Sequence, residues 1–284
     1  MILVTGVTGR VGQAAARALL QRDYAVRGLV RDPQRLDRHG LEKLDVATAD
    51  LTDPASIDEA MAGICCALLV TGNSDRQLEL ESNFVTSAEQ AGIQHIVKVS
   101  AVGAGSTAST PIPKIHFAVE QLIKQSNMDW TILQPNFFMQ NLLMQAPYIA
   151  DTNQFALPFG TVRTALVDCA DVGEAVAVVL SGAGHAGRTY TLAGANLYSF
   201  EQVARVLTAA IGRDIQYVDQ DPREFKDILG HFVESEWQVN AVCELFAEIK
   251  AGALESMSTE LEDLLGRKPT SLEDFAHRHR AIFG

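Results

Sequence analysis

Short apolar runs alternate with amphipathic segments through the first half of the chain. Because the apolar runs are nearly continuous, we expect strands that are buried on both faces, as in a parallel sheet. Segments with apolar residues three and four positions apart lie between them and predict helices. The alternation is typical of βαβ units and predicts an α/β fold with a doubly wound parallel sheet. The predicted strands are residues 2–5, 25–30, 44–49, 65–71, 95–100 and 130–134, and the predicted helices are 10–21, 54–62, 77–90 and 115–124.

After residue 135 the alternation weakens. Three further segments have the pattern of strands and two have the pattern of helices, and residues 222–284 are almost entirely helical in pattern. We therefore expect a smaller, mixed α+β and mostly helical C-terminal part, packed beside the carboxyl edge of the sheet. The further strands are 163–167, 188–192 and 214–218, and the further helices are 171–180 and 200–211.

A glycine-rich segment joins the first predicted strand to the first predicted helix. There Gly6 permits a tight turn, Gly9 lets the backbone approach a pyrophosphate, and Gly12 allows close packing of helix and sheet. The helix N-terminus also attracts an anion. Because the strand precedes and the helix follows, this pattern predicts a Rossmann dinucleotide-binding domain. The residues predicted to bind the cofactor here are Gly6, Val7, Thr8, Gly9, Arg10, Val11 and Gly12.

These patterns divide the chain into an NAD(P)-binding Rossmann domain, residues 1–135, and a smaller substrate-binding portion, residues 136–284. We expect some segments of the second portion to return to the Rossmann sheet.

The end of the second strand indicates which dinucleotide binds. NAD-specific domains carry an acidic residue about 20 residues beyond the glycines, which holds the ribose 2′-hydroxyl. Here the strand ends with Arg31, a cation suited to an adenosine 2′-phosphate, and Arg10 and Arg35 can add donors. NADP(H) is therefore preferred. NAD(H) stays possible because Asp32 follows directly.

Composition excludes several classes of function. The 284 residues carry a net charge of -12 and no basic run, which argues against nucleic-acid binding. The four cysteines form no Cys-x-x-Cys pair, so we expect no metal or thiol redox site. The start of the chain has no leader pattern and no apolar run approaches the roughly 18 residues of a membrane helix, which predicts a cytoplasmic protein without membrane contact. We expect a small-molecule substrate and a monomer or homodimer.

Seven segments of the chain carry motifs of a known family, and they are residues 5–12, 30–33, 50–51, 97–100, 134–141, 168–172 and 190–194. Together they resemble the NmrA-like, atypical branch of the short-chain dehydrogenase/reductase superfamily over most of the chain. Within that family, the resemblance is greatest to NADPH-dependent quinone and triphenylmethane dye reductases rather than to regulatory members.

The resemblance implies further cofactor contacts at the carboxyl ends of the predicted strands, where open α/β sheets bind ligands. Asp50 and Leu51 are expected to approach the adenine, and Thr71 and Gly72 the ribose on the nicotinamide side. Asp50 also fits the cap of a turn, and the two phenylalanines of residues 135–138 also fit the core. The residues expected to border the nicotinamide are Pro135, Asn136, Phe137 and Phe138.

The Tyr-x-x-x-Lys pair of the superfamily is absent. Aligning Val119 and Glu120 with the family's helix puts Ile112 at the tyrosine position and His116 at the lysine position. His116, with an ordinary pKa of about 6.5, suits a contact with the nicotinamide ribose or proton donation, and also suits packing at a helix start. Lys114 is a second candidate for substrate or phosphate contact.

The resemblance and the residues favour an NAD(P)H-dependent reductase acting on a quinone-like or conjugated acceptor. Hydride addition to such a π-system gives a delocalised product that solvent can protonate, so no tyrosine acid is needed. The apolar residues 137–144 would stack the acceptor. The alternative is an NADP(H)-binding redox sensor that acts through a protein partner, which the missing tyrosine supports. The same absence argues against a nucleotide-sugar epimerase.

Overall fold

The computed structural model describes all 284 residues, and their contacts divide the chain into two compact units. Unit 1 comprises Met1–Ala108, Pro113–Pro135 and Cys169–Thr191, and unit 2 comprises Ser109–Ile112, Asn136–Asp168 and Leu192–Gly284. The boundary does not follow a single point in the sequence, because the chain leaves unit 1 after Pro135 and comes back to it at Cys169.

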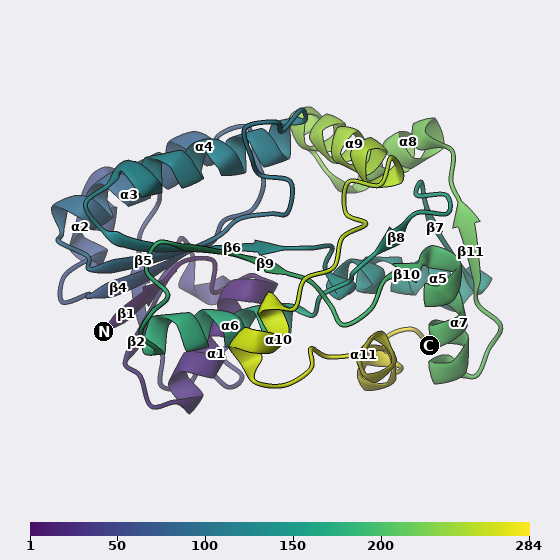
Figure 1. Cartoon of the computed structure of the whole chain (residues 1–284), viewed down its shortest axis with the longest axis horizontal. Coiled ribbons are helices and arrows are strands. Elements are labelled where there is room, and N and C mark those ends of the chain that lie inside the picture. The colour runs from purple at the N-terminus through teal and green to yellow at the C-terminus, as the bar shows by residue number, and fades with distance from the viewer. The chain divides into compact units, whose positions relative to one another are not determined.

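Unit 1 is built on a seven-stranded sheet in the order β3-β2-β1-β4-β5-β6-β9 (Figure 1). All pairings among β1 to β6 are parallel. The strand order reverses between β1 and β4, which confirms the predicted doubly wound Rossmann fold and places its switch point there. The strands are β1 (Ile2–Val4), β2 (Val26–Val30), β3 (Asp45–Thr48), β4 (Cys66–Leu69), β5 (His95–Val99), β6 (Asp129–Pro135) and β9 (Arg188–Leu192).

Helices cover both faces of this sheet, with α2, α3 and α4 on one side and α1 and α6 on the other (Figure 1). Gly173 lets α6 approach α1 closely, because a Cβ at this glycine would lie 2.6 Å from Ala14. Asp53 caps the N-terminus of α2, where its side chain accepts from the Ala55 amide. The helices are α1 (Arg10–Gln21), the 3₁₀ turn η1 (Pro33–Arg35), α2 (Pro54–Ala60), α3 (Gln77–Gln90), α4 (Pro111–Gln125) and α6 (Cys169–Ser181).

One expectation about the sheet was wrong. The sequence predicted that every strand of the first half is buried on both faces, yet Asp45 and Thr48 of β3 are exposed and the two residues between them are only partly buried. β3 is one of the two edge strands, so it has a neighbour on one side only. The core lies further in, where Leu3, Phe84, Ile96 and Ile132 belong to one buried cluster.

Unit 2 contains two small two-stranded sheets and all of the C-terminal helices. β7 (Gln154–Leu157) pairs in parallel with β11 (Gln216–Asp219), and β8 (Arg163–Thr164) pairs antiparallel with β10 (Tyr198–Ser199). The sequence predicted β11, α7 and the helical C-terminus but neither β7 nor α5. The helices are η2 (Met139–Gln145), α5 (Ala146–Thr152), α7 (Phe200–Ile211), α8 (Pro222–Phe232), α9 (Glu236–Lys250), α10 (Glu260–Leu265) and α11 (Leu272–His279).

An aromatic cluster forms much of the core of unit 2. The rings of Phe137 and Phe159 pack edge to face with centroids 5.6 Å apart, and Phe200 lies 4.7 Å from Phe159. Phe246 lies 4.6 Å from Phe159 and extends the cluster to α9. In the whole molecule, no helix combines the length and apolar character needed to cross a bilayer.

Candidate functional site

The glycine-rich loop after β1 has the geometry that the sequence predicted. Gly6 adopts a left-handed φ of +63°, and a Cβ there would lie 2.7 Å from the carbonyl oxygen of Val70. A Cβ at Gly12 would lie 2.3 Å from the Gly6 carbonyl oxygen. The Gly9 amide donates to that same carbonyl at 2.8 Å and closes the turn. Glycine is therefore required at positions 6 and 12 by the backbone itself.

The N-terminus of α1 fits a dinucleotide pyrophosphate. Its N-cap residue, Gly9, supplies no side-chain cap, and the first turn contains no acidic residue. Thr8, Gly9 and Arg10 are exposed, and the only heavy atom near a Cβ built on Gly9 is the Gly6 carbonyl oxygen at 3.3 Å. The first-turn N–H groups of a helix need acceptors, and a phosphate is well suited to that role.

Arg31 and Asp50 lie just beyond the ends of β2 and β3, and their charges interact. Arg31 is exposed. Hydrogen bonds from Thr52 hold the pKa of Asp50 below its ordinary value, and the charges of Arg31 and Arg76 lower it further. The Thr52 amide donates to the Asp50 carboxylate at 2.8 Å, so Asp50 caps a turn.

The side chain of Asp32 makes a hydrogen bond within its own turn. Its carboxylate accepts from the Gln34 amide at 2.9 Å and begins the η1 turn. Arg31 and Asp32 are both exposed at the end of β2, but the Asp32 carboxylate already accepts a hydrogen bond within its own turn.

Hydrogen bonds join the carboxyl ends of β1 and β4. The Thr5 hydroxyl donates to the Val70 carbonyl at 2.8 Å and accepts from the Val70 amide at 2.7 Å. Both backbone groups of Val70 are thus fixed immediately before Thr71. Thr71 is half-buried and Gly72 is exposed.

Beneath Thr71 lies a buried polar cluster that sequence reasoning missed. One carboxylate oxygen of Glu81, Oε1, accepts from Thr71 at 2.5 Å, from Gln77 at 3.2 Å and from Lys98 at 2.8 Å. The side chains of Glu81 and Lys98 are both 0% exposed. A lysine in the middle of the apolar strand 95–99 was the available signal, since a buried lysine needs an acidic partner.

His116 lies on α4 and is 6% exposed, and its Nδ1 atom has no hydrogen-bond partner. Burial, together with the positive charge of Lys98, holds the pKa of His116 well below its ordinary value. The imidazole is therefore neutral at neutral pH. Lys114 on the same helix is exposed, and Ile112, at the family's tyrosine position, is 2% exposed.

The segment after β6 is held firmly by unit 2. Asn136 donates from its amide to the Leu192 carbonyl at 2.9 Å and from Nδ2 to the Leu254 carbonyl at 3.2 Å. The Phe137 ring belongs to the aromatic core of unit 2, whereas Phe138 is half-buried.

Two segments that carry the family resemblance meet at Asp168. Gln140 donates to one carboxylate oxygen of Asp168 at 2.6 Å, and Arg278 of α11 lies 3.0 Å from the other. Asp168 is 1% exposed, so its charge is compensated inside unit 2.

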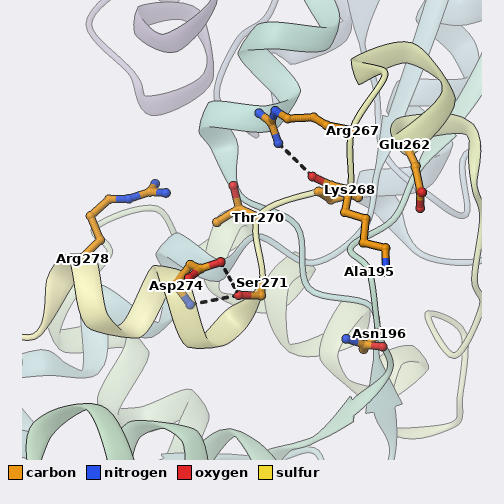
Figure 2. A pocket seen from close by; sticks show the side chains of 10 residues that line it. Ala195, Asn196, Glu262, Arg267, Lys268, Thr270, Ser271, Asp274 and Arg278 are labelled. Carbon is orange, nitrogen blue, oxygen red and sulfur yellow. Dashed lines mark hydrogen bonds between the residues drawn. The ribbon is translucent and has the colours of Figure 1, made fainter.

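Arg278 also lines an open, polar pocket of about 720 Å³ in unit 2. Ser271 and Asp274 point toward each other at the start of α11, where the serine hydroxyl donates to the carboxylate at 2.7 Å (Figure 2). Arg267 donates to the Lys268 carbonyl at 3.0 Å. The pocket is lined by Ala195, Asn196, Glu262, Arg267, Lys268, Pro269, Thr270, Ser271, Asp274 and Arg278.

Several known proteins are similar to this chain over most of its length. The sequence model described as the NmrA-like family matches residues 1–276. An NAD(P)H azoreductase of Xenophilus azovorans is 30% identical over 284 residues, which cover 100% of this chain and 99% of that protein. Quinone oxidoreductase 2 of Escherichia coli (strain K12) is 26% identical, with 96% of each chain covered.

Solved structures give the same result for the fold. The NADPH-dependent quinone oxidoreductase of Escherichia coli, complexed with NADPH, superposes with a TM-score of 0.88 at 25% identity and covers 98% of this chain and 99% of that one. Triphenylmethane reductase of Citrobacter sp. superposes with a TM-score of 0.87 at 22% identity, with 99% of each chain covered.

Proposed function

The chain belongs to the NmrA-like family and is an NAD(P)H-dependent reductase, and we propose that it prefers NADPH and transfers the hydride to a quinone-like or conjugated small-molecule acceptor. The observation that carries this proposal is the loop of residues 6–12, which opens α1 without a side-chain cap and so suits a pyrophosphate. Relatives named as azoreductase and quinone oxidoreductase support the class of acceptor.

Different residues of the chain would bind different parts of the cofactor. The loop 6–12 would hold the pyrophosphate, and Arg31 would bind the 2′-phosphate through charge-assisted hydrogen bonds. Asp50 and Leu51 would lie beside the adenine. Thr71 and Gly72 would contact the ribose on the nicotinamide side, and Pro135, Asn136, Phe137 and Phe138 would border the nicotinamide.

The proposed acceptor is consistent with the missing tyrosine acid. When bound, NADPH supplies the hydride, and the protein supplies position and a dry environment. An electron-poor π-system spreads the added charge, so solvent can provide the proton. His116 would serve as a neutral contact to the cofactor rather than as a cationic acid, because its pKa lies well below neutrality. Lys114, which is exposed, would contact substrate or phosphate.

Steady-state oxidation of NADPH and NADH with quinones, azo dyes and triphenylmethane dyes tests this function. We expect turnover with several acceptors and a higher kcat/KM for NADPH than for NADH. Tight NADPH binding without oxidation by any acceptor would refute the reductase and support the redox sensor. Purified protein carrying Gly9→Val provides the control for contaminating reductases.

A further inference from the structure

The buried ion pair between Glu81 on α3 and Lys98 on β5 lies under the segment that follows β4. Both side chains are 0% exposed, and Nζ lies 2.8 Å from Oε1. Two charges removed from water gain little net stability from their attraction, and an apolar pair of similar volume often does as well. Net stability therefore does not explain why this ion pair is buried under the segment that follows β4.

Thr71 connects the buried ion pair to the protein surface through its hydrogen bond to Glu81. Of the three groups that donate to Glu81 Oε1, Gln77 and Lys98 are completely buried, whereas Thr71 is half-buried. A threonine hydroxyl has one proton, and here that proton is donated to Glu81 at 2.5 Å. Toward any ligand, the Thr71 oxygen can then only accept.

The backbone next to Thr71 is fixed as well. The Thr5 hydroxyl bonds both the amide and the carbonyl of Val70, at 2.7 and 2.8 Å. Thr71 is thus held from β1 through the backbone and from α3 through its side chain. A group held in this way binds a ligand without a further cost of ordering.

We propose that Glu81 and Lys98 are positioning residues for the cofactor, and that they act by making the Thr71 hydroxyl an acceptor for a ribose hydroxyl in the nicotinamide half of NADPH. This inference rests on the proposed function. A carboxylate only accepts hydrogen bonds, and the adjacent ammonium of Lys98 matches its charge. Because its proton is donated to Glu81, the Thr71 hydroxyl can only accept a hydrogen bond from a ligand. A ribose hydroxyl can donate that hydrogen bond.

Three variants test the inference with two ligands. Thr71→Val removes the hydroxyl and leaves the ion pair intact, Thr71→Ser keeps the hydroxyl, and Glu81→Gln replaces the carboxylate. NADPH carries both halves of the cofactor, whereas 2′,5′-ADP lacks the nicotinamide half. The dissociation constants of both are measured by calorimetric titration.

We expect Thr71→Val and Glu81→Gln each to weaken NADPH binding by about tenfold, the effect of one lost hydrogen bond, and to leave the affinity for 2′,5′-ADP within about twofold. Thr71→Ser should retain wild-type affinity. The double variant Thr71→Val/Glu81→Gln should bind NADPH no more weakly than either single variant, because both changes remove the same contact. Glu89→Gln is the matched control, since Glu89 is an exposed residue of the same helix that accepts only from Asn127.

Any of three results would overturn the inference. They are equal losses of affinity for NADPH and 2′,5′-ADP, wild-type NADPH affinity in Thr71→Val, and additive losses of NADPH affinity in the double variant. If Glu81→Gln does not fold, Glu81→Leu/Lys98→Met removes both buried charges and takes its place, and the same selective loss is expected. A wild-type protein that binds neither ligand would refute the proposed function itself, and this inference with it.

Discussion

Replacing Gly9 with valine separates cofactor binding from folding, because the structure gives Gly9 and Gly12 different surroundings. Gly9 has φ -101° and ψ 171°, an extended conformation that any residue adopts. A Cβ there meets a single atom, the Gly6 carbonyl oxygen at 3.3 Å. A Cβ at Gly12 meets three backbone atoms, at 2.3, 2.5 and 2.6 Å. Only the second substitution forces the loop and α1 apart.

The magnitudes follow from these contacts. An exposed substitution with one close contact should cost about 1 kcal/mol or less, which shifts Tm by about 2–4 °C in a protein of this size. At Gly12, overpacking against backbone should cost about 1–3 kcal/mol or more. A valine side chain at Gly9 would keep a phosphate from the first-turn N–H groups. Loss of two charge-assisted hydrogen bonds of about 1.5–3 kcal/mol each corresponds to more than about 100-fold in affinity.

Thermal unfolding, monitored by circular dichroism, measures the change in stability. Fluorescence titration with NADPH measures the change in cofactor affinity. Gly9→Val should melt within a few degrees of the wild type and bind NADPH more than about 100-fold more weakly. Gly12→Val should show a clearly lower Tm. Gly105→Val is the matched control, since nothing lies within 4 Å of a Cβ at that loop glycine. A folded Gly9→Val protein with near-normal NADPH affinity would refute the assignment of this loop to the pyrophosphate.

Three further predictions follow from the charged and buried groups. Arg31→Ala should weaken NADPH binding by about 10- to 150-fold and NADH binding by less than about threefold, since only NADPH carries the 2′-phosphate, and equal losses in parallel titrations would exclude this role. His116→Gln should reduce the acid sensitivity of folding. Below about pH 6.5 the unfolded chain binds a proton that the buried imidazole does not accept, so the wild-type free energy of unfolding falls as pH falls, by at most about 1.4 kcal/mol per pH unit from this residue. Urea titrations of both proteins between about pH 5 and 8 compare the slopes, and identical slopes would contradict the depressed pKa. Asp168→Asn should lower the free energy of unfolding by about 1–3 kcal/mol, because it weakens the bonds to Gln140 and Arg278, and an unchanged urea midpoint would show that this contact adds nothing.

Local sequence pattern was sufficient for much of unit 1. The spacing of apolar residues predicted α1 from residue 10 to 21 and α3 from 77 to 90, and both helices have these bounds. The roles of Gly6 and Gly12 were also readable, because the tight turn and the close approach of helix to strand depend on residues within a few positions of each other. These features arise from backbone sterics and local hydrogen bonds, which depend only on residues close together in the sequence.

Pairings between distant segments required the tertiary structure. The four residues of β7 become a strand by pairing with β11, where Phe155 lies opposite Tyr217. β3 was expected to be buried on both faces, yet at the edge of the sheet Asp45 and Thr48 are exposed and the two residues between them are only partly buried. In both cases the neighbour, and not the local pattern, determines what the segment does.

The buried polar contacts show the same limit at the candidate site. Glu81 lies on an amphipathic helix and Lys98 in an apolar strand, and nothing in their spacing of 17 positions pairs them. Asp168 and Arg278 are 110 positions apart. The sequence determined the fold class and the loop that suits a pyrophosphate, because local geometry fixes both. Only the tertiary structure decided which buried charges compensate each other, because desolvated charges must find partners wherever the fold brings them together.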